Sequence, residues 1–165
     1  MKTLRTAFLA LFLVGLFASP GIEAQSSWDL GPYLGLNFEN DKLLIGGVAR
    51  IHLASSPITL NPAIEFYPGI NDTGAGLSRS LLVLNFDGQY QIEAESWEPY
   101  VGAGISWARA ATETQDAATD IGLNIKGGML FNPRGSAQPY TEAVLNFSGS
   151  ESLVLRAGLL FVIGR

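Results

Sequence analysis

The feature that most constrains this chain is a strict alternation of side-chain character between Trp97 and Trp107. The odd positions hold mostly apolar residues, namely Trp97, Pro99, Val101, Ala103, Ile105 and Trp107. The even positions hold small or polar residues, namely Glu98, Tyr100, Gly102, Gly104 and Ser106. A period of two indicates a β-strand, because successive side chains leave the backbone on opposite faces. One such strand also occurs in soluble proteins, so the rest of the chain decides what it means.

The same alternation recurs along the chain between short turns. The eight predicted strands span residues 27–38, 43–53, 58–67, 79–92, 97–107, 120–131, 139–147 and 153–163. Strands of about ten residues with this pattern are typical of transmembrane β-barrels. An even number lets the sheet close with both termini on one side and no exposed edge. The predicted fold is therefore an all-β, eight-stranded antiparallel up-and-down transmembrane β-barrel with short turns.

The N-terminal segment has the pattern of a secretory signal peptide. Lys2 and Arg5 precede an apolar run at Ala7–Ala18, and Ser19-Pro20-Gly21 ends it. The run is shorter than the roughly 20 residues of a membrane-spanning helix, which disfavours the alternative of an uncleaved anchor. We expect cleavage after Ala24, which leaves residues 25–165 as a single outer-membrane barrel domain.

Charge decides which face of the strands meets lipid. The apolar face carries no charged residue, whereas the other face carries Asp29, Arg50, Glu65, Arg79, Asp87, Glu98, Lys126, Glu142 and Arg156. An Arg or Lys pointing into the bilayer midplane costs roughly 2–4 kcal/mol, so this face should line the lumen. Buried charges are tolerated when they are paired. We therefore predict a lumen charge cluster of Lys126, Glu142, Arg156, Glu65, Arg79, Arg50 and Asp87.

Within this cluster we expect two groups. Lys126, Glu142 and Arg156 lie on three successive predicted strands near mid-height, and Glu65 and Arg79 face each other across the longest predicted loop, Pro68–Gly76. An eight-stranded barrel has an interior just wide enough for side chains to fill. A filled and cross-linked lumen would act as a plug.

Aromatic residues on the apolar face gather near the strand ends. If the first strand runs outward, a periplasmic girdle comprises Trp28, Tyr90, Trp97, Phe131 and Phe161. An outer girdle comprises Phe38, Phe66, Trp107 and Phe147. Amphipathic Trp and Tyr favour membrane–water interfaces, so the two girdles support a membrane-embedded barrel.

The run Pro99-Tyr100-Val101-Gly102-Ala103-Gly104-Ile105-Ser106-Trp107 resembles the "PYVGAGxGY"-type strand of small bacterial outer-membrane β-barrel proteins, the porin-like or OmpA/OmpX-type barrel domain. The resemblance implies an outer-membrane location and insertion from the periplasm, with periplasmic chaperones and the barrel-insertion machinery as partners during biogenesis. It implies no single activity, because members include anchors, adhesins and small-solute channels. This chain departs from the usual terminal aromatic residue, since it ends Phe161-Val162-Ile163-Gly164-Arg165.

Composition and motifs argue against several function classes. The net charge of −5 disfavours a nucleic-acid partner, and the absence of Cys removes thiolate metal sites. The only histidine, His52, faces inward near Ser55 and Ser56, where it could not serve a lipid-modifying hydrolase. Residues 71–76 superficially resemble a calcium loop but lack its remaining acidic ligands. We expect no catalysis, no metal and no cofactor.

The favoured function is therefore that of an integral outer-membrane barrel with a structural or envelope-permeability role. We expect it to be a monomer and to be surrounded by outer-membrane lipid. One alternative is a narrow channel or conduit for small or apolar solutes. Another is a soluble, lipocalin-like ligand-binding barrel with the apolar face inside. An adhesin is unsupported, because only Pro68–Leu77 and the predicted loop Ala111–Ala118 have any reach.

Overall fold

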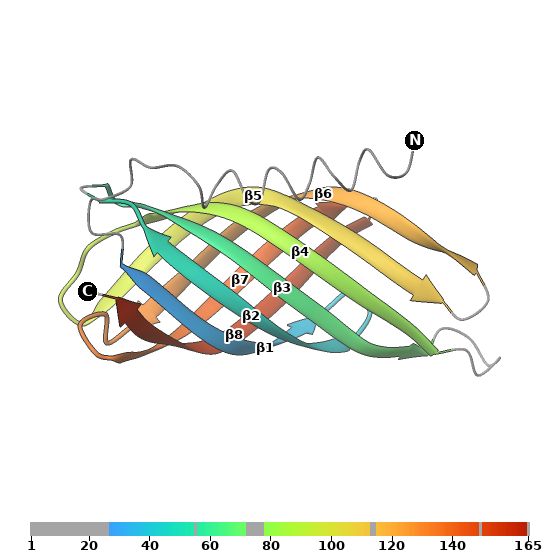
Figure 1. The fold of residues 1–165 in the computed structure, drawn as a ribbon, viewed down its shortest axis with the longest axis horizontal. Helices are drawn as coiled ribbons and strands as arrows, with labels where there is room; N and C mark the ends of the chain where they lie inside the picture. Colours follow the sequence, from blue (N-terminus) through green and yellow to red (C-terminus); the bar gives the residue numbers. More distant parts are fainter. Residues whose placement is uncertain (1–26, 55, 72–77, 113–114, 149, 165) are drawn as a thin grey trace.

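The computed structural model describes residues 27–54, 56–71, 78–112, 115–148 and 150–164. Its strands are β1 (Trp28–Asn37), β2 (Lys42–His52), β3 (Ile58–Asn71), β4 (Ser78–Gln91), β5 (Trp97–Thr112), β6 (Gln115–Phe131), β7 (Ala137–Ser148) and β8 (Ser150–Gly164). Each strand pairs antiparallel with the next, and β8 pairs with β1 to close a barrel (Figure 1). The predicted eight-stranded antiparallel barrel is confirmed. In these ranges, no helix is long and apolar enough to cross a membrane.

Both ends of the described chain lie at one end of the barrel, where β1 begins and β8 ends (left in Figure 1). We call this end the terminal mouth. Because consecutive strands are antiparallel, the β2–β3, β4–β5 and β6–β7 connections also lie there. The remaining connections lie at the opposite mouth. The strands β3 to β6 are longer than β1 and β2 and continue further toward that opposite mouth.

Polar and charged side chains fill the interior together with tyrosines and a few aliphatic residues such as Leu44, Val144 and Leu160, whereas apolar side chains cover the outside. Along β1, the buried residues are Asp29, Gly31, Tyr33, Gly35 and Asn37. The intervening residues point outward, and Leu34 is 64% exposed. The same inversion holds on β6, where Lys126 is 5% exposed and Ile121 is 72% exposed. The side chains that an ordinary soluble protein would bury are therefore on its lateral surface.

The predicted loop Ala111–Ala118 is wrong, because β5 and β6 continue through most of it. Arg109 pairs with Thr119 and Thr112 pairs with Gln115, so only residues 113–114 separate the two strands. Arg109 and Thr119 are both exposed. Backbone hydrogen bonds between β5 and β6 hold these strand ends together. Their side chains do not alternate between apolar and polar, so the sequence pattern did not reveal that the strands continue.

The predicted loop Pro68–Gly76 is also too long at its start. β3 continues to Asn71 and β4 begins at Ser78, with Ile70 paired to Arg79 across a register shift. Residues 72–77, and with them most of the segment that resembled a calcium loop, lie outside the described residues.

Inward-facing glycines let strands and tyrosine rings approach closely. A methyl group at Gly31 would overlap the backbone carbonyl of Leu159, and one at Gly46 would overlap the ring of Tyr33. The outward-facing Gly47 differs, because an added methyl would come no closer than 4.0 Å to the backbone of Gly31. The lumen therefore needs glycine where backbone or aromatic rings pass, whereas the outer wall does not.

We predict that Gly31→Ala prevents or strongly destabilises folding, whereas Gly47→Ala folds like the parent. The overlap at Gly31 involves backbone, which cannot rotate away, and overpacking of this kind typically costs about 1–3 kcal/mol or more. Both variants carry the same substitution on neighbouring strands. The measurement is the heat-dependent shift in gel mobility of the refolded protein. Equal folding yields for the two variants would contradict this account of the lumen.

Candidate functional site

Arg156 on β8 lies at the centre of a buried ion-pair network inside the barrel. Its Nη1 donates to Glu142 Oε1 on β7 at 2.8 Å, and its Nη2 contacts Glu65 Oε1 on β3. The three side chains are 2–6% exposed. One guanidinium thus joins carboxylates from the adjacent strand and from across the lumen, which is the forked geometry that arginine provides.

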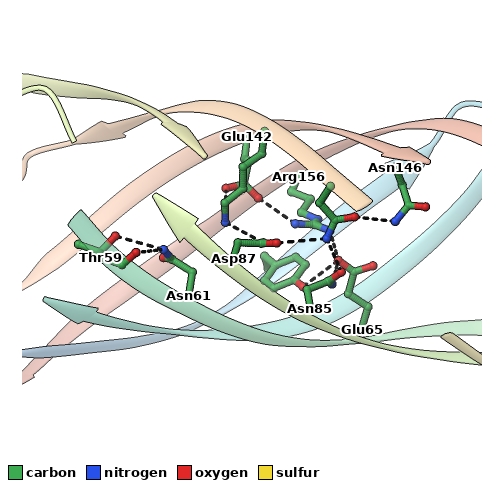
Figure 2. Close-up of polar contacts among 11 residues, drawn as sticks. Thr59, Asn61, Glu65, Asn85, Asp87, Glu142, Asn146 and Arg156 are labelled. Carbon is green, nitrogen blue, oxygen red and sulfur yellow. Dashed lines mark hydrogen bonds and ion pairs between the residues drawn. The ribbon is translucent and has the colours of Figure 1, made fainter. Parts of the chain in front are cut away.

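Lys126 on β6 extends this network to a further carboxylate. Its Nζ lies 3.1 Å from Asp87 Oδ2 on β4 and 3.4 Å from Glu142 Oε2. Glu142 is therefore shared between Lys126 and Arg156. Figure 2 shows Glu142, Asp87, Arg156 and Glu65 turned towards one another in the interior. The structure thus brings together five of the residues predicted as the lumen charge cluster.

Neutral side chains complete the hydrogen bonding of Glu65. The hydroxyls of Tyr33 and Tyr67 donate to its two carboxylate oxygens, each at 3.1 Å. Asn85 Nδ2 donates to Oε1 at 3.1 Å. These donors and Arg156 replace the hydrogen bonds that the carboxylate of Glu65 would otherwise make to water. A buried charge is tolerated only with such partners.

An amide ladder continues from Asn85 towards β7. Asn124 Nδ2 donates to Asn85 Oδ1 at 2.9 Å and to Asp87 Oδ1 at 3.2 Å. Asn146 Nδ2 donates to Asn124 Oδ1 at 2.7 Å and to Ser106 Oγ at 2.9 Å. These asparagines were not predicted as site residues. Their inward positions in the period-two pattern were the available indication.

Arg50 is buried in the lumen but lies apart from this ion-pair network. Its guanidinium carbon lies 4.7 Å from the ring centre of Tyr100 and 5.3 Å from that of Tyr140. Among the described residues it forms no ion pair, and its Nε and Nη1 have no hydrogen-bond partner. Stacking on aromatic rings therefore replaces the carboxylate partner that we expected.

The predicted pairing of Glu65 with Arg79 falls partly outside what the structure describes. The strand register places Glu65 opposite Val83 and Arg79 opposite Ile70. Glu65 is occupied by Arg156, which lies across the lumen. The side chain of Arg79 is outside the described residues.

The predicted girdle residues lie on the outer face, toward the two ends of the barrel. Those toward the terminal mouth are Trp28, Tyr90, Trp97, Phe131 and Phe161, all 39–50% exposed. Of the second set, Phe38, Phe66 and Phe147 are exposed and Trp107 is partly exposed. β3 and β5 continue five residues beyond Phe66 and Trp107, so these two do not end their strands as predicted. Phe66 and Trp107 would lie at a membrane–water interface if the ends of β3 and β5 projected beyond the membrane.

The terminal mouth contains the single histidine. His52 Nε2 lies 2.7 Å from Asp29 Oδ2. Ser56 Oγ accepts a hydrogen bond from the backbone N–H of Ile58 at 3.1 Å, and Ser55 is outside the described residues. Among the residues that the structure describes, no group of three His, Asp or Glu could hold a metal ion.

A cavity of about 580 Å³ opens at the terminal mouth beside His52. Its lining includes Glu93 and Glu95 from the β4–β5 turn, Glu98 from β5 and Gln138 from β7. We did not predict this cavity as a site. The three acidic residues within positions 93–98 were the only indication in the sequence.

No family model matches the sequence, and no curated protein matches it. Solved structures are nevertheless similar in fold. Neisserial surface protein A (NspA) aligns with a TM-score of 0.62 and 16% identity, over 84% of this chain and 96% of that chain. Ail, the attachment invasion locus protein of Yersinia pestis, solved with the heparin analogue sucrose octasulfate, gives 0.60 and 10%, over 86% and 100%. A de novo designed transmembrane β-barrel gives 0.54 and 17%, over 83% and 95%.

These similarities define the class of fold. The chain has the fold of the small membrane-spanning β-barrels, a group that includes outer-membrane surface proteins such as NspA and Ail. The resemblance noted in its sequence is thereby confirmed at the level of the fold. Identities of 10–17% carry no activity from those proteins to this one.

We predict that Arg156→Met lowers the free energy of unfolding by about 3–5 kcal/mol, because it leaves Glu65 and Glu142 buried without their guanidinium partner. The measurement is urea unfolding of the folded barrel in detergent or vesicles, followed by tryptophan fluorescence. Arg109→Met removes an exposed arginine on β5 and should change little. Adding Glu65→Gln to Arg156→Met should recover part of the loss. Equal losses for Arg156→Met and Arg109→Met would contradict the network's role.

Proposed function

We propose that this protein is an integral outer-membrane β-barrel with a plugged lumen and a structural or envelope-permeability role, without catalysis. The observation that carries the proposal is the distribution of side chains around the closed barrel. Apolar residues cover the outer wall of every strand, including Leu34, Leu43, Ile64, Phe86, Val101, Ile121, Leu145 and Leu155. Soluble monomers rarely expose an apolar patch beyond a few hundred Å². An apolar belt around the whole barrel suits the hydrocarbon layer of a membrane.

The lipocalin-like alternative requires the opposite arrangement. Its ligand cavity would be lined by the apolar face, and the charged residues would cover the outside. Here Arg156, Lys126 and Glu142 are buried in the lumen, whereas Leu155, Ile125 and Leu145 are exposed on the outer wall. This distribution therefore favours a lipid-embedded barrel.

The buried network favours a plug over a conduit. Arg156, Glu65, Glu142, Lys126 and Asp87 join β3, β4, β6, β7 and β8 across the interior. Moving a solute through this level would require breaking ion pairs that have little access to water, which is strongly unfavourable. Narrow conduction thus remains a second candidate only for a lumen that can open transiently.

The cellular setting belongs to the same proposal. The signal peptide expected at residues 1–24 lies outside the described residues. If it directs export, the terminal mouth faces the periplasm, and chaperones and the insertion machinery deliver the barrel to the outer membrane. A closed sheet presents no free edge for pairing with a second copy, which supports a monomer.

We predict that Ile125→Arg in phospholipid vesicles lowers the free energy of unfolding by about 2–4 kcal/mol, because Ile125 is an outward-facing residue in the middle of β6. The matched variant Ile163→Arg places the same group at the end of β8, where the effect should be about 0–1 kcal/mol. The measurement is reversible urea unfolding in vesicles. A soluble barrel would be insensitive to both substitutions, and that result would contradict membrane insertion.

We predict that the purified barrel gives no discrete conductance steps in planar lipid bilayers, because the ion-pair network fills the lumen. A general porin of larger strand number is the positive control, since its lumen is an aqueous channel. Steps that change in size in Lys126→Ala or Glu142→Ala would instead support the conduit.

A further inference from the structure

The closed part of the barrel has no free edge, but the sheet that continues beyond it at the opposite mouth does. β7 ends at Ser148, and its ladder with β6 ends at the pair Leu123–Phe147. β6 begins at Gln115, so residues 115–122 extend past the end of β7 while β5 still pairs with them (Figure 1). Among the described residues, no strand pairs with the other side of this segment. An open edge of this kind is a site for pairing with another chain.

The strand register identifies the N–H groups that face this open edge. Asn132 N–H donates to the carbonyl of Ser96, and the register between β5 and β6 continues from there to Ala118 without a shift. Hydrogen-bonded pairs alternate along an antiparallel ladder, so even-numbered residues of β6 bond to β5. The odd-numbered Thr119 and Ile121 therefore direct their backbone groups to the other side, where β7 has ended.

The side chain of Asp120 occupies one of these donors. Its Oδ1 accepts a hydrogen bond from the N–H of Ile121 at 2.9 Å, at the first edge position beyond the β6–β7 ladder. The carbonyl of an added strand would have to displace this oxygen to reach Ile121. Asp120 is exposed, so the bond adds little to stability, since water can replace either partner. Its effect should therefore fall on pairing with another strand and not on folding.

The open edge on β3 carries a different block at the corresponding position. The β2–β3 ladder ends at the pair Ile45–Phe66, and even-numbered residues of β3 face β2, because Leu53 N–H donates to the carbonyl of Ile58. The next even-numbered residue is Pro68, which has no N–H to offer. Proline and charged side chains are devices that keep edge strands from pairing with other chains. Both edges thus lack a free donor at the position next to the closed barrel.

We propose that Asp120 is an autoinhibitory cap, which prevents the β6 edge of one copy of this chain from pairing with the β6 edge of a second copy. A β6 edge is the partner that fits, because the β3 edge lacks a donor at Pro68. Two identical segments of residues 115–122 running antiparallel supply each other with donors and acceptors. The proposal extends the monomeric state proposed above, because it names a contact that maintains that state.

The test is sedimentation equilibrium of the folded barrel in a density-matched non-ionic detergent, so that the measured mass is that of the protein alone. We expect a monomeric parent, whereas Asp120→Ala should approach about twice the parent mass as its concentration rises, because paired copies form a dimer. Asp120→Asn is the matched control and should stay monomeric, since its amide oxygen can still accept from Ile121. Glu151→Ala removes another exposed carboxylate at the opposite mouth and should also stay monomeric.

Adding Thr119→Pro to Asp120→Ala tests where the two copies meet. Thr119 directs its N–H to the open edge, so proline there removes a donor for an added strand but no bond to β5. The double variant should return to the monomeric mass. Asp120→Val also lacks the acceptor and favours a strand, so it provides the same test if Asp120→Ala does not fold. Folding of each variant is checked by the heat-dependent shift in gel mobility.

Three results would overturn the cap. The first is a monomeric mass for folded Asp120→Ala or Asp120→Val at every concentration, which would leave the proposed membrane barrel unaffected. The second is association of Asp120→Asn or Glu151→Ala as strong as that of Asp120→Ala, because loss of charge would then be responsible. The third is unchanged association after Thr119→Pro, which would place the contact elsewhere. Association of the parent would contradict the monomeric state itself, and the cap with it.

Discussion

The structure depends on keeping charged side chains paired in a space from which water is largely excluded. Arg156 satisfies Glu65 and Glu142 together, and Lys126 satisfies Asp87 and Glu142. Because these residues come from strands that are distant in sequence, each ion pair also fixes which strands face one another across the lumen. Most large apolar side chains point outward, and the aliphatic residues that are buried inside, such as Leu44, Val144 and Leu160, pack without directional preference. Polar pairing therefore gives the barrel its specific interior.

Glycine makes this polar interior possible. The rings of Tyr33, Tyr100 and Tyr140 lie where an added methyl group at Gly46, Gly128 and Gly158 would overlap them. Tyrosine contributes an apolar ring together with a hydroxyl, so Tyr33 can fill space and also donate to Glu65. The same positions with larger side chains would force the strands apart. The high glycine content is thus a requirement of the narrow lumen.

Sequence pattern predicted the fold and the side-chain orientation because a lipid-facing wall forbids charge at every second residue. It indicated which residues line the lumen and that Lys126, Glu142 and Arg156 group together, but it did not indicate that Glu65 pairs with Arg156. Partner choice depends on the stagger of the strands around the barrel, as the contact between Arg156 and Glu65 shows. The extension of β5 and β6 was missed because an exposed ladder imposes no alternation on Arg109 and Thr119. The cavity was missed because it combines turns that the sequence does not place beside one another.

Hydrogen bonding is not equally complete throughout the interior. Around Glu65, Asn85 and Asn124 the polar groups bond to one another. Buried polar atoms without a hydrogen-bond partner belong to Arg50, Asn61, Gln89, Gln91 and Gln138, and within the ion-pair network to Asp87 Oδ2 and Arg156 Nε. Each buried polar group without a partner is unfavourable, so these atoms lower the stability that the network provides. The ion-pair network closes the middle of the barrel, although not every polar atom around it has a partner.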